Sequence, residues 1–299
     1  MADRLHDKLV YGRLGPWYYR GRVLLHSGRR PALDPADEEL SRTLTADALC
    51  VTSIEHLGLP EASRFRSAAD RLLPALQVRA PASDPPDLTE ADPSDGRNTH
   101  LHCLSVDPPE LAEIAPDVLL WGVQERMLAI MATYLGLPPA LTTVHVRRDF
   151  GNGRQVGTRI WHRDTEDQKV VRAVVYLTDV GDADGPFEYV PRELNHLCAP
   201  LEERAFRAAG DPVHDDEMAS YVPRGRWRTA TGGPGAVVIA DNAALYHHGK
   251  PHSSERIAVF YTYTSRDPRY PRIRRNPRFD DRLRPHQRAA FYVDTDPPG

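Results

Sequence analysis

Two short segments of this chain carry residues that could hold a metal ion. The first is Trp161-His162-Arg163-Asp164, and the second is Tyr246-His247-His248-Gly249. Residues i and i+2 of an extended strand point to the same side, so His162 and Asp164 could bind one ion together. Two imidazoles and one carboxylate form the ligand set of non-haem iron(II) sites and leave coordination positions open for reactants. The two segments therefore predict a reactive metal site.

A second His-x-Asp triplet competes with the first. A chain with 13 histidines is expected to contain His-x-Asp triplets by chance, and His214-Asp215-Asp216 has the same spacing. Context separates the two, because the first triplet precedes the apolar strand predicted from Val170 to Thr178. The second lies in a charged, proline-flanked insertion. This difference favours His162 and Asp164.

The distal imidazole has three candidates, His247, His248 and His252. They lie between two apolar strands predicted at 236–240 and 257–261. Adjacent strand residues project to opposite sides, so at most one of His247 and His248 reaches the metal. The residues alone do not decide between them. His100, His102 and His145 are interpreted as packing or surface residues.

Arg256 stands nine residues after His247 and opens the next apolar strand. A guanidinium buried near a metal needs a carboxylate as its partner, and a dicarboxylate co-substrate could supply one. The competing interpretation is a surface arginine in an arginine-rich chain. The position of Arg256 at the start of the strand favours a guanidinium that reaches into the metal cavity.

Composition restricts the class of protein. The chain has 299 residues, of which 40% are hydrophobic, and its formal charge is −4. This length allows one large β-rich domain or two modest ones, and the hydrophobic content predicts a globular protein with a core. The small net charge argues against a nucleic-acid or membrane surface as the main partner. The start of the chain lacks the apolar stretch of a signal peptide, so we expect a cytoplasmic protein. Three scattered cysteines predict neither a disulfide framework nor a zinc cluster.

The first half of the chain predicts helices around a few strands. Helices are expected over 35–44, 61–76 and 117–135, and strands over 48–54 and near 101–106. Residues 1–34 are expected to wrap the surface. Residues 80–98 are proline-rich and polar, which predicts a long loop or mobile lid, with a domain boundary as the alternative.

From residue 140 onward the periodicity becomes that of strands. Short strands are expected over 142–148, 159–161, 170–178, 187–190, 235–240 and 257–264. Their spacing is typical of a sandwich or barrel and not of βαβ units. An insertion at 199–233, with a helix over 201–209, interrupts them. The tail 266–299 is expected to cover the barrel or to join an interface.

Several of these stretches resemble one family, the iron(II)- and 2-oxoglutarate-dependent oxygenases of the phytanoyl-CoA dioxygenase-like superfamily. Ile160 to Asp164 matches its proximal motif, and Val175 to Val180 with Asp184 to Pro191 resembles the strand and turn that follow. Tyr246 to Pro251, continued to Arg256, resembles its distal segment. The family continues Pro-Gly-Ser-His where this chain has Pro191-Arg192-Glu193-Leu194. The resemblance covers about residues 35–265 and is strongest from 140 to 265.

The resemblance implies a fold and a reaction. The fold is mostly β with flanking helices, around a double-stranded β-helix (a cupin-like jelly roll). It forms a single domain, with 1–139 as support and 140–265 as the core. The implied metal ligands are His162, Asp164 and His247, which hold Fe(II). Arg256 is implied to bind the distal carboxylate of 2-oxoglutarate, and O2 is the oxidant.

The resemblance also implies oxidation of an unactivated C–H bond in a small molecule. Hydroxylation is the first expectation, with desaturation, cyclisation and epimerisation as variants, and we hypothesise a role in bacterial secondary metabolism. Asp164 argues against halogenation, for which related enzymes replace this carboxylate. Tyr176 and Thr178 are candidates to assist Arg256. Arg147, Arg154 and Arg159 precede the metal motif and could contact an anionic substrate, although an ordinary surface charge is the favoured interpretation of each.

Two other functions fit the same residues. A zinc or other metal-dependent hydrolase could use the same three ligands. A non-catalytic jelly-roll binding protein is the second alternative. The presence of all three ligands together with Arg256 argues against it, because a protein without turnover does not need a reactive ion.

Overall fold

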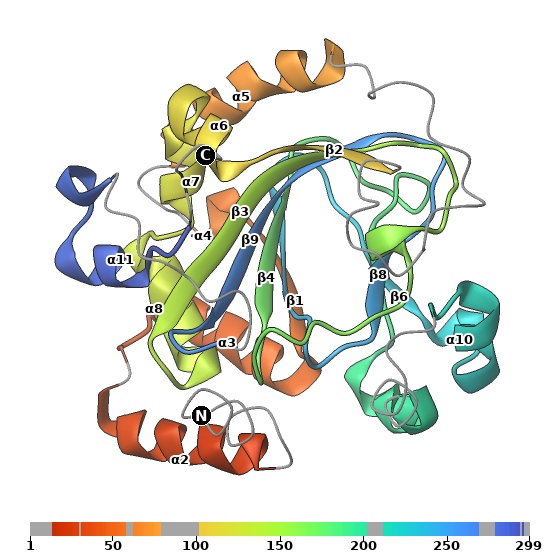
Figure 1. Ribbon diagram of the computed structural model, residues 1–299, viewed down its shortest axis with the longest axis horizontal. Helices are drawn as coiled ribbons and strands as arrows, with labels where there is room; N and C mark the ends of the chain where they lie inside the picture. The colour runs from red at the N-terminus through yellow and green to blue at the C-terminus, as the bar shows by residue number, and fades with distance from the viewer. Residues whose placement is uncertain are drawn as a thin grey trace, which may run out of the picture.

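Two antiparallel sheets face each other in this protein, and helices cover the outer side of the larger one (Figure 1). The structure is a computed structural model. It describes residues 14–29, 31–57, 62–78, 102–201, 212–268, 279–293 and 295. These elements form three layers in the order helices, large sheet and small sheet.

The large sheet has six strands in the order β1-β7-β4-β9-β3-β2, and the small sheet has three in the order β6-β5-β8. Every pairing of these strands is antiparallel. Residues 161 and 162 extend the small sheet, because His162 bridges to His247 on β8. From β3 onward the chain repeatedly crosses from one sheet to the other. The strands are β1 (Leu49–Ser53), β2 (Cys103–Val106), β3 (Pro139–Asp149), β4 (Val171–Tyr176), β5 (Phe187–Tyr189), β6 (Arg228–Ala230), β7 (Ala236–Asp241), β8 (His247–Gly249) and β9 (Arg256–Ser265).

The alternation of side chains along β9 explains why both faces of the large sheet are buried. Ile257 and Val259 pack into the core beneath the helices, whereas Ala258 and Phe260 pack between the two sheets with Phe187 of β5. Successive strand residues point to opposite faces, so an almost continuously apolar strand needs a layer on each side. The residues with even numbers on β9 therefore face the space between the sheets.

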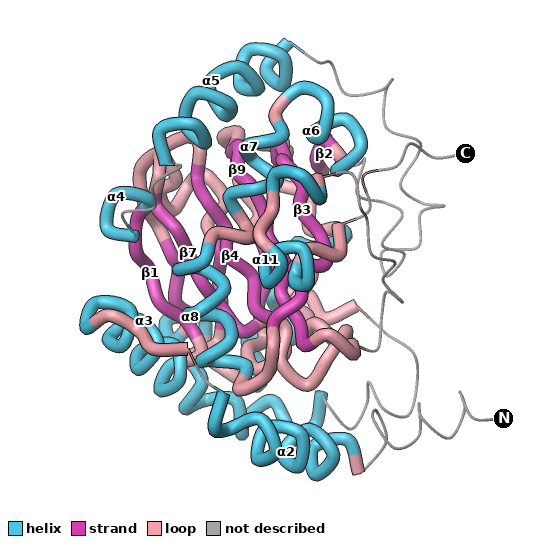
Figure 2. Tube along the Cα trace, turned by 90° about the vertical axis from the view of Figure 1, so that its left-hand side faces the viewer, coloured by secondary structure: helices cyan, strands magenta, loops and turns pink. Residues whose placement is uncertain are grey.

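Most helices form one layer on the outer face of the large sheet (Figure 2). α2 (Gly15–His26) lies beside this layer, and α10 (Asp215–Tyr221) lies outside the small sheet. None of the described helices combines the length and the apolar composition that crossing a bilayer requires. The helices of the layer are α3 (Pro35–Asp47), α4 (Ile54–Leu57), α5 (Ala62–Val78), α6 (Pro108–Ile114), α7 (Pro116–Trp121), α8 (Glu125–Leu135) and α11 (Pro285–Ala290).

Several predicted elements are present where the sequence placed them. α3 begins with Pro35 at its first position, and the Asp34 side chain accepts a hydrogen bond from the Asp37 backbone amide at 3.0 Å. This is the capping chemistry expected at a helix start. Helix 61–76 corresponds to α5, and the strands expected at 142–148, 170–178, 187–190, 235–240 and 257–264 correspond to β3, β4, β5, β7 and β9.

The single helix predicted over 117–135 is wrong, because the chain turns between α7 and α8. Gly122 ends α7 against the sheet: a Cβ atom there would lie 2.6 Å from Cδ1 of Tyr261 and 2.8 Å from Cδ2 of Leu141. The strand predicted at 159–161 is a 3-10 turn over Gly157–Arg159 followed by the bridge at 161–162. α2, β6 and β8 were not predicted.

Some expectations fall outside the described residues. The loop over 80–98 lies there, and so does the helix expected over 201–209, except for Leu201. The division into a single domain stays a prediction. Part of the tail covers the sheet as expected, since Phe291 bridges to Leu141 of β3 and the Tyr292 amide donates to the Leu141 carbonyl at 3.0 Å.

Candidate metal centre

The structure brings His162, Asp164 and His247 together, although 83 residues of chain separate the last two. One ligand atom from each lies within 4.8 Å of the others. His162 and His247 face each other as a hydrogen-bonded strand pair, each amide donating to the other's carbonyl at 3.0 Å. Their rings are 4.4 Å apart between centroids. Backbone pairing therefore fixes the separation of the two imidazoles.

Both imidazoles are oriented by their own backbone. Nδ1 of His162 lies 2.7 Å from the Ile160 carbonyl, and Nδ1 of His247 lies 3.0 Å from the Leu245 carbonyl. A proton on each Nδ1 then leaves the lone pair on each Nε2, which is the tautomer that metal-binding histidines use. Nε2 of His162 is 3.6 Å from Oδ1 of Asp164. The donor set thus fits a divalent ion.

Burial keeps these histidines neutral. Burial lowers the pKa of His162. Burial and the nearby His162 imidazole together lower the pKa of His247 to about 3. A neutral imidazole is required for coordination. The two rings therefore offer lone pairs throughout the physiological range.

Asp164 is held ionised by its surroundings. Burial alone would raise its pKa, but the Arg172 guanidinium and the two imidazoles outweigh burial and lower the pKa to about 2. Nε of Arg172 lies 2.9 Å from Oδ2 of Asp164, without the alignment of a hydrogen bond. The Asn242 amide nitrogen is 2.9 Å from Nε2 of His247. Arg172 and Asn242 therefore border the three candidate ligands.

His248 faces away from this centre. Its Nε2 is 2.8 Å from Oε2 of Glu188, its Nδ1 is 2.9 Å from the Arg159 carbonyl, and its ring stacks on Trp161 at 3.9 Å. Of the two adjacent histidines, only His247 joins the group. His248 instead ties β8 to β5 and to the segment before His162.

The other candidate histidines are engaged elsewhere. Nδ1 of His214 contacts the Gln155 side chain, and Asp216 forms an exposed ion pair with Arg224. Nε2 of His252 lies 2.8 Å from the Arg159 guanidinium. The second His-x-Asp triplet is therefore at the start of α10 and not at the metal centre, as its context indicated.

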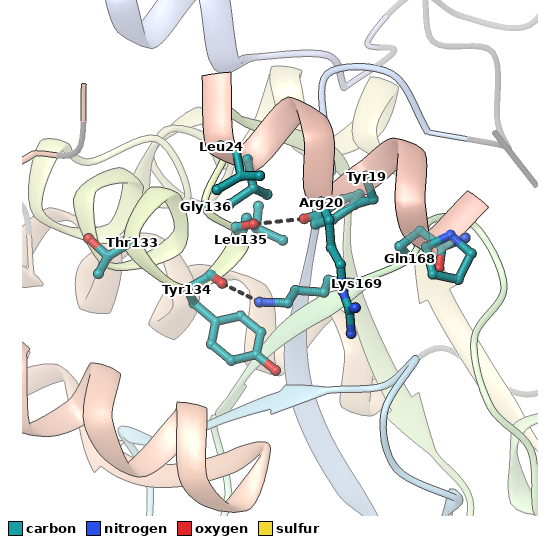
Figure 3. Close-up of a pocket in the computed structure, with 11 residues that line it drawn as sticks. Tyr19, Arg20, Leu24, Thr133, Tyr134, Leu135, Gly136, Gln168 and Lys169 are labelled. Carbon is teal, nitrogen blue, oxygen red and sulfur yellow. Dashed lines mark hydrogen bonds between the residues drawn. The ribbon is translucent and has the colours of Figure 1, made fainter. Parts of the chain in front are cut away.

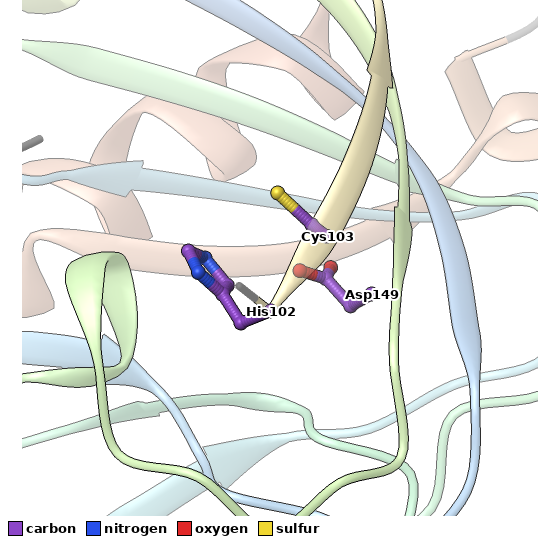
Figure 4. A group of neighbouring side chains, drawn as sticks. All are labelled: His102, Cys103 and Asp149. Carbon is purple, nitrogen blue, oxygen red and sulfur yellow. The ribbon is translucent and has the colours of Figure 1, made fainter. Parts of the chain in front are cut away.

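A second group with metal-binding residue types lies at the start of β2 and the end of β3: His102, Cys103 and Asp149 (Figure 4). Burial raises the pKa of Cys103 to about 11, so the thiol stays protonated. Oδ2 of Asp149 already accepts two hydrogen bonds from Arg256, at 2.6 and 3.0 Å. A cation here would compete with the Arg256 guanidinium for the Asp149 carboxylate, so this group does not suit a metal.

Arg256 lies inside the protein as expected, but it already has a carboxylate partner. Its side chain is 6% exposed and it shares the inner face of β9 with Ala258 and Phe260. Besides Asp149, it donates to the Gly185 carbonyl. Burial alone would lower the pKa of Arg256, and Asp149 reverses this and raises it. In this structure Asp149 therefore supplies the carboxylate partner that the sequence analysis assigned to a dicarboxylate co-substrate.

The remaining candidates take structural positions. The Tyr176 hydroxyl donates to the Ala230 carbonyl at 2.7 Å and accepts from the Phe187 amide, and the Thr178 hydroxyl accepts from the Ile257 amide. Arg159 is buried and donates to backbone carbonyls and to Asn152. These side chains hold strands and loops around the centre.

The sequence analysis missed four residues of this region: Asp149, Arg172, Glu188 and Asn242. The sequence contained a signal that could have identified two of them. Arg172 is the one charged residue in the apolar run of β4, and Asp149 continues the polar alternation His145, Arg147, Asp149 on β3. Charged residues in a strand that is otherwise apolar indicate a functional or paired interior.

A pocket of about 450 Å³ lies away from the metal centre, between α2 and the end of α8 (Figure 3). Tyr19 donates to the Leu135 carbonyl at 2.8 Å, and Lys169 donates to the Tyr134 carbonyl at 2.5 Å. The first contact attaches α2 to α8, and the second attaches the segment before β4 to α8. None of the candidate metal ligands lines this pocket.

Comparisons with known proteins give structural likeness at low sequence identity. No protein-family model matches the chain, and no curated protein sequence matches it significantly. HygX from Streptomyces hygroscopicus, solved with nickel and 2-oxoglutarate, matches with a TM-score of 0.49 and 18% identity over 89% of this chain and 98% of its own. EctD from S. alaskensis matches with a TM-score of 0.49 and 16% identity over 79% and 80%.

The non-haem alpha-ketoglutarate-dependent epimerase SnoN from nogalamycin biosynthesis is also similar. Its TM-score is 0.46, with 17% identity over 78% of this chain and 82% of its own. EctD has also been solved with bound Fe and with 2-oxoglutarate and 5-hydroxyectoine.

Proposed function

We propose that this chain is an iron(II)- and 2-oxoglutarate-dependent oxygenase that oxidises a C–H bond of a small molecule. The observation that carries the proposal is the convergence of His162, Asp164 and His247, with both Nδ1 atoms tied to backbone carbonyls. Two neutral imidazoles and one carboxylate leave open positions on an octahedral ion, as the chemistry requires.

The same proposal includes the fold. A chain that crosses between two facing antiparallel sheets, with the order β7-β4-β9-β3 in one and β6-β5-β8 plus the 161–162 segment in the other, has the connectivity of a double-stranded β-helix. This connectivity supports assigning the pair of sheets as a jelly roll. The helices of the outer layer then leave the space between the sheets for the reaction.

Each residue has a defined task in the proposed reaction. His162, Asp164 and His247 hold iron(II), and Asp164 contributes the negative charge. Iron(II) with bound 2-oxoglutarate supplies the activation of O2. Arg172 keeps Asp164 ionised, and the Phe187 ring, stacked on His247 at 5.1 Å, excludes water from one side. Arg256 is assigned to the distal carboxylate of 2-oxoglutarate and shares its charge with Asp149.

Anaerobic titration tests the proposal. Addition of iron(II) and 2-oxoglutarate to the protein should produce a weak visible charge-transfer band, and the band should be absent in His162→Ala. His196→Ala is the matched control, because His196 is exposed and contacts only the Glu193 carbonyl among the described residues. No band in the wild type, and no succinate from 2-oxoglutarate with any substrate, would overturn it. Tight zinc without 2-oxoglutarate binding would instead favour a hydrolase.

A further inference from the structure

A buried cluster of charged residues lies between the two sheets, at the end of β3 and the start of β9. It contains three guanidinium groups, those of Arg147, Arg159 and Arg256, and one carboxylate, that of Asp149. Their exposed fractions are 7%, 2%, 5% and 2%. Asp149 interacts electrostatically with all three. The cluster therefore carries more positive than negative charge.

Two of the three guanidinium groups have most of their hydrogen-bonding capacity in use. Arg256 donates twice to Asp149 and once to the Gly185 carbonyl. Arg159 donates to the carbonyls of His102, Phe150 and Arg154, to Asn152 and to His252. Both arginines thus act as fixed parts of the local structure.

Arg147 is different. Arg147 donates to the Thr158 hydroxyl at 3.1 Å and lies 3.4 Å from Nε2 of His145. Neither of these partners carries a negative charge. Its Nε is buried and has no hydrogen-bond partner. Within the described part of the chain, no carboxylate lies within ion-pair distance of Arg147. A buried guanidinium without a counter-charge costs several kcal/mol, so this position suits an anion.

Arg147 and Arg256 both lie beside the ring of Phe260. Their Cζ atoms are 5.0 and 5.8 Å from the centre of the Phe260 ring. Arg147 pairs with Ala258 across β3 and β9, and both Ala258 and Phe260 pack between the sheets. The two arginines therefore border the same stretch of the inner face.

We propose that Arg147 binds the distal carboxylate of the dicarboxylate co-substrate beside Arg256, and that the two arginines form a clamp. Asp149 already offsets the charge of Arg256, which leaves the charges of Arg147 and Arg159. Arg159 has its hydrogen bonds in use in the local structure, so Arg147 is the guanidinium that can serve a ligand. This inference rests on the proposed function. It gives Arg147 of β3, one of three arginines that the sequence offered as contacts for an anionic substrate, a binding role for the co-substrate instead.

The test measures binding and not turnover. Manganese(II)-loaded protein is titrated by calorimetry with 2-oxoglutarate and with 2-oxovalerate, which has the same five-carbon chain and metal-chelating end but a methyl group in place of the distal carboxylate. The variants are Arg147→Met, Arg147→Lys and, as a control, Arg148→Met. Arg148 is the next residue of β3 on its opposite face, where it pairs with Glu255.

Arg147→Met should raise the Kd for 2-oxoglutarate roughly ten- to hundredfold, the range of a lost hydrogen bond to a charged group. The Kd for 2-oxovalerate should change less than about twofold, and Arg147→Lys should recover part of the affinity. Arg148→Met should bind both ligands as the wild type does.

Two results would overturn the clamp alone: unchanged 2-oxoglutarate binding by Arg147→Met, or an equal loss for both ligands, which would indicate a structural role. Thermal unfolding of each variant identifies a misfolded protein, and Arg147→Lys then decides the question. A wild-type protein that binds manganese(II) but not 2-oxoglutarate would overturn the proposed function, and the clamp with it.

Discussion

At the scale of single residues, the surroundings of the candidate ligands control protonation. Burial lowers the pKa of both imidazoles, and Arg172 helps to lower the pKa of Asp164 against the effect of burial. Protons therefore compete weakly with a metal ion for all three groups. The metal affinity should be almost independent of pH in the neutral range.

Arg172→Gln should make metal binding more sensitive to acid. Removing the guanidinium raises the pKa of Asp164 and of both histidines, so protons displace the metal at a higher pH than in the wild type. Metal content after dialysis at a series of pH values from 7 to 4 measures this, with exposed Arg224→Gln as the control. A midpoint equal to or below that of the wild type would contradict the role given to Arg172.

The buried pair Asp149–Arg256 permits a second prediction about residues. Asp149→Asn and Arg256→Met should each lower the free energy of unfolding by roughly 3–5 kcal/mol, because each leaves a buried charge without its partner. The double variant should lose less than the sum of the two. Urea unfolding of all four proteins gives the coupling energy, and strictly additive losses would argue against a coupled pair.

At the scale of elements, the sequence predicted most strands but not how they meet. Apolar runs predict β4, β7 and β9, since a strand buried on both faces has no polar side. His247 and His248 are the same residue type, so residue type cannot decide between them. The choice depends on which of the two pairs with the backbone of His162. The Asp149–Arg256 contact joins residues 107 positions apart, so no local pattern contains it.

The break between α7 and α8 leads to a prediction about elements. Gly122→Val should lower the free energy of unfolding by roughly 1–3 kcal/mol, because its side chain would overlap the Tyr261 ring and Leu141. Gly21→Ala in α2 is the control: nothing lies within 4 Å of the added Cβ, and helix propensity should make it neutral or stabilising by up to about 1 kcal/mol. Thermal unfolding compares the stabilities of the two variants. A Gly122→Val variant as stable as the wild type would contradict the close packing at this position.

At the scale of the whole molecule, the candidate ligands join separate parts of the chain. His162 and Asp164 precede the large sheet's β4, whereas His247 belongs to β8 of the small sheet. An ion that binds all three links these parts in the folded state only. Metal binding should therefore stabilise the entire fold.

Removal of metal with a chelator should lower the Tm, and its return should restore it. At a free metal concentration about a hundred times the Kd, the gain is about 2.7 kcal/mol, which raises the Tm by roughly 4 °C for a chain of this size. His247→Ala should lose this response. A metal-dependent Tm that persists unchanged in His247→Ala would place the bound ion elsewhere in the molecule.

The reciprocal backbone hydrogen bonds between His162 and His247 make the site depend on the length of the chain as well as on its residues. Moving β8 by one position would present His248 to Asp164 and turn His247 towards Glu188, with every residue type unchanged. A single insertion or deletion between Ala240 and His247 could thus abolish the site. In aligned relatives, gap placement in this connection would be as informative as the identity of the histidines.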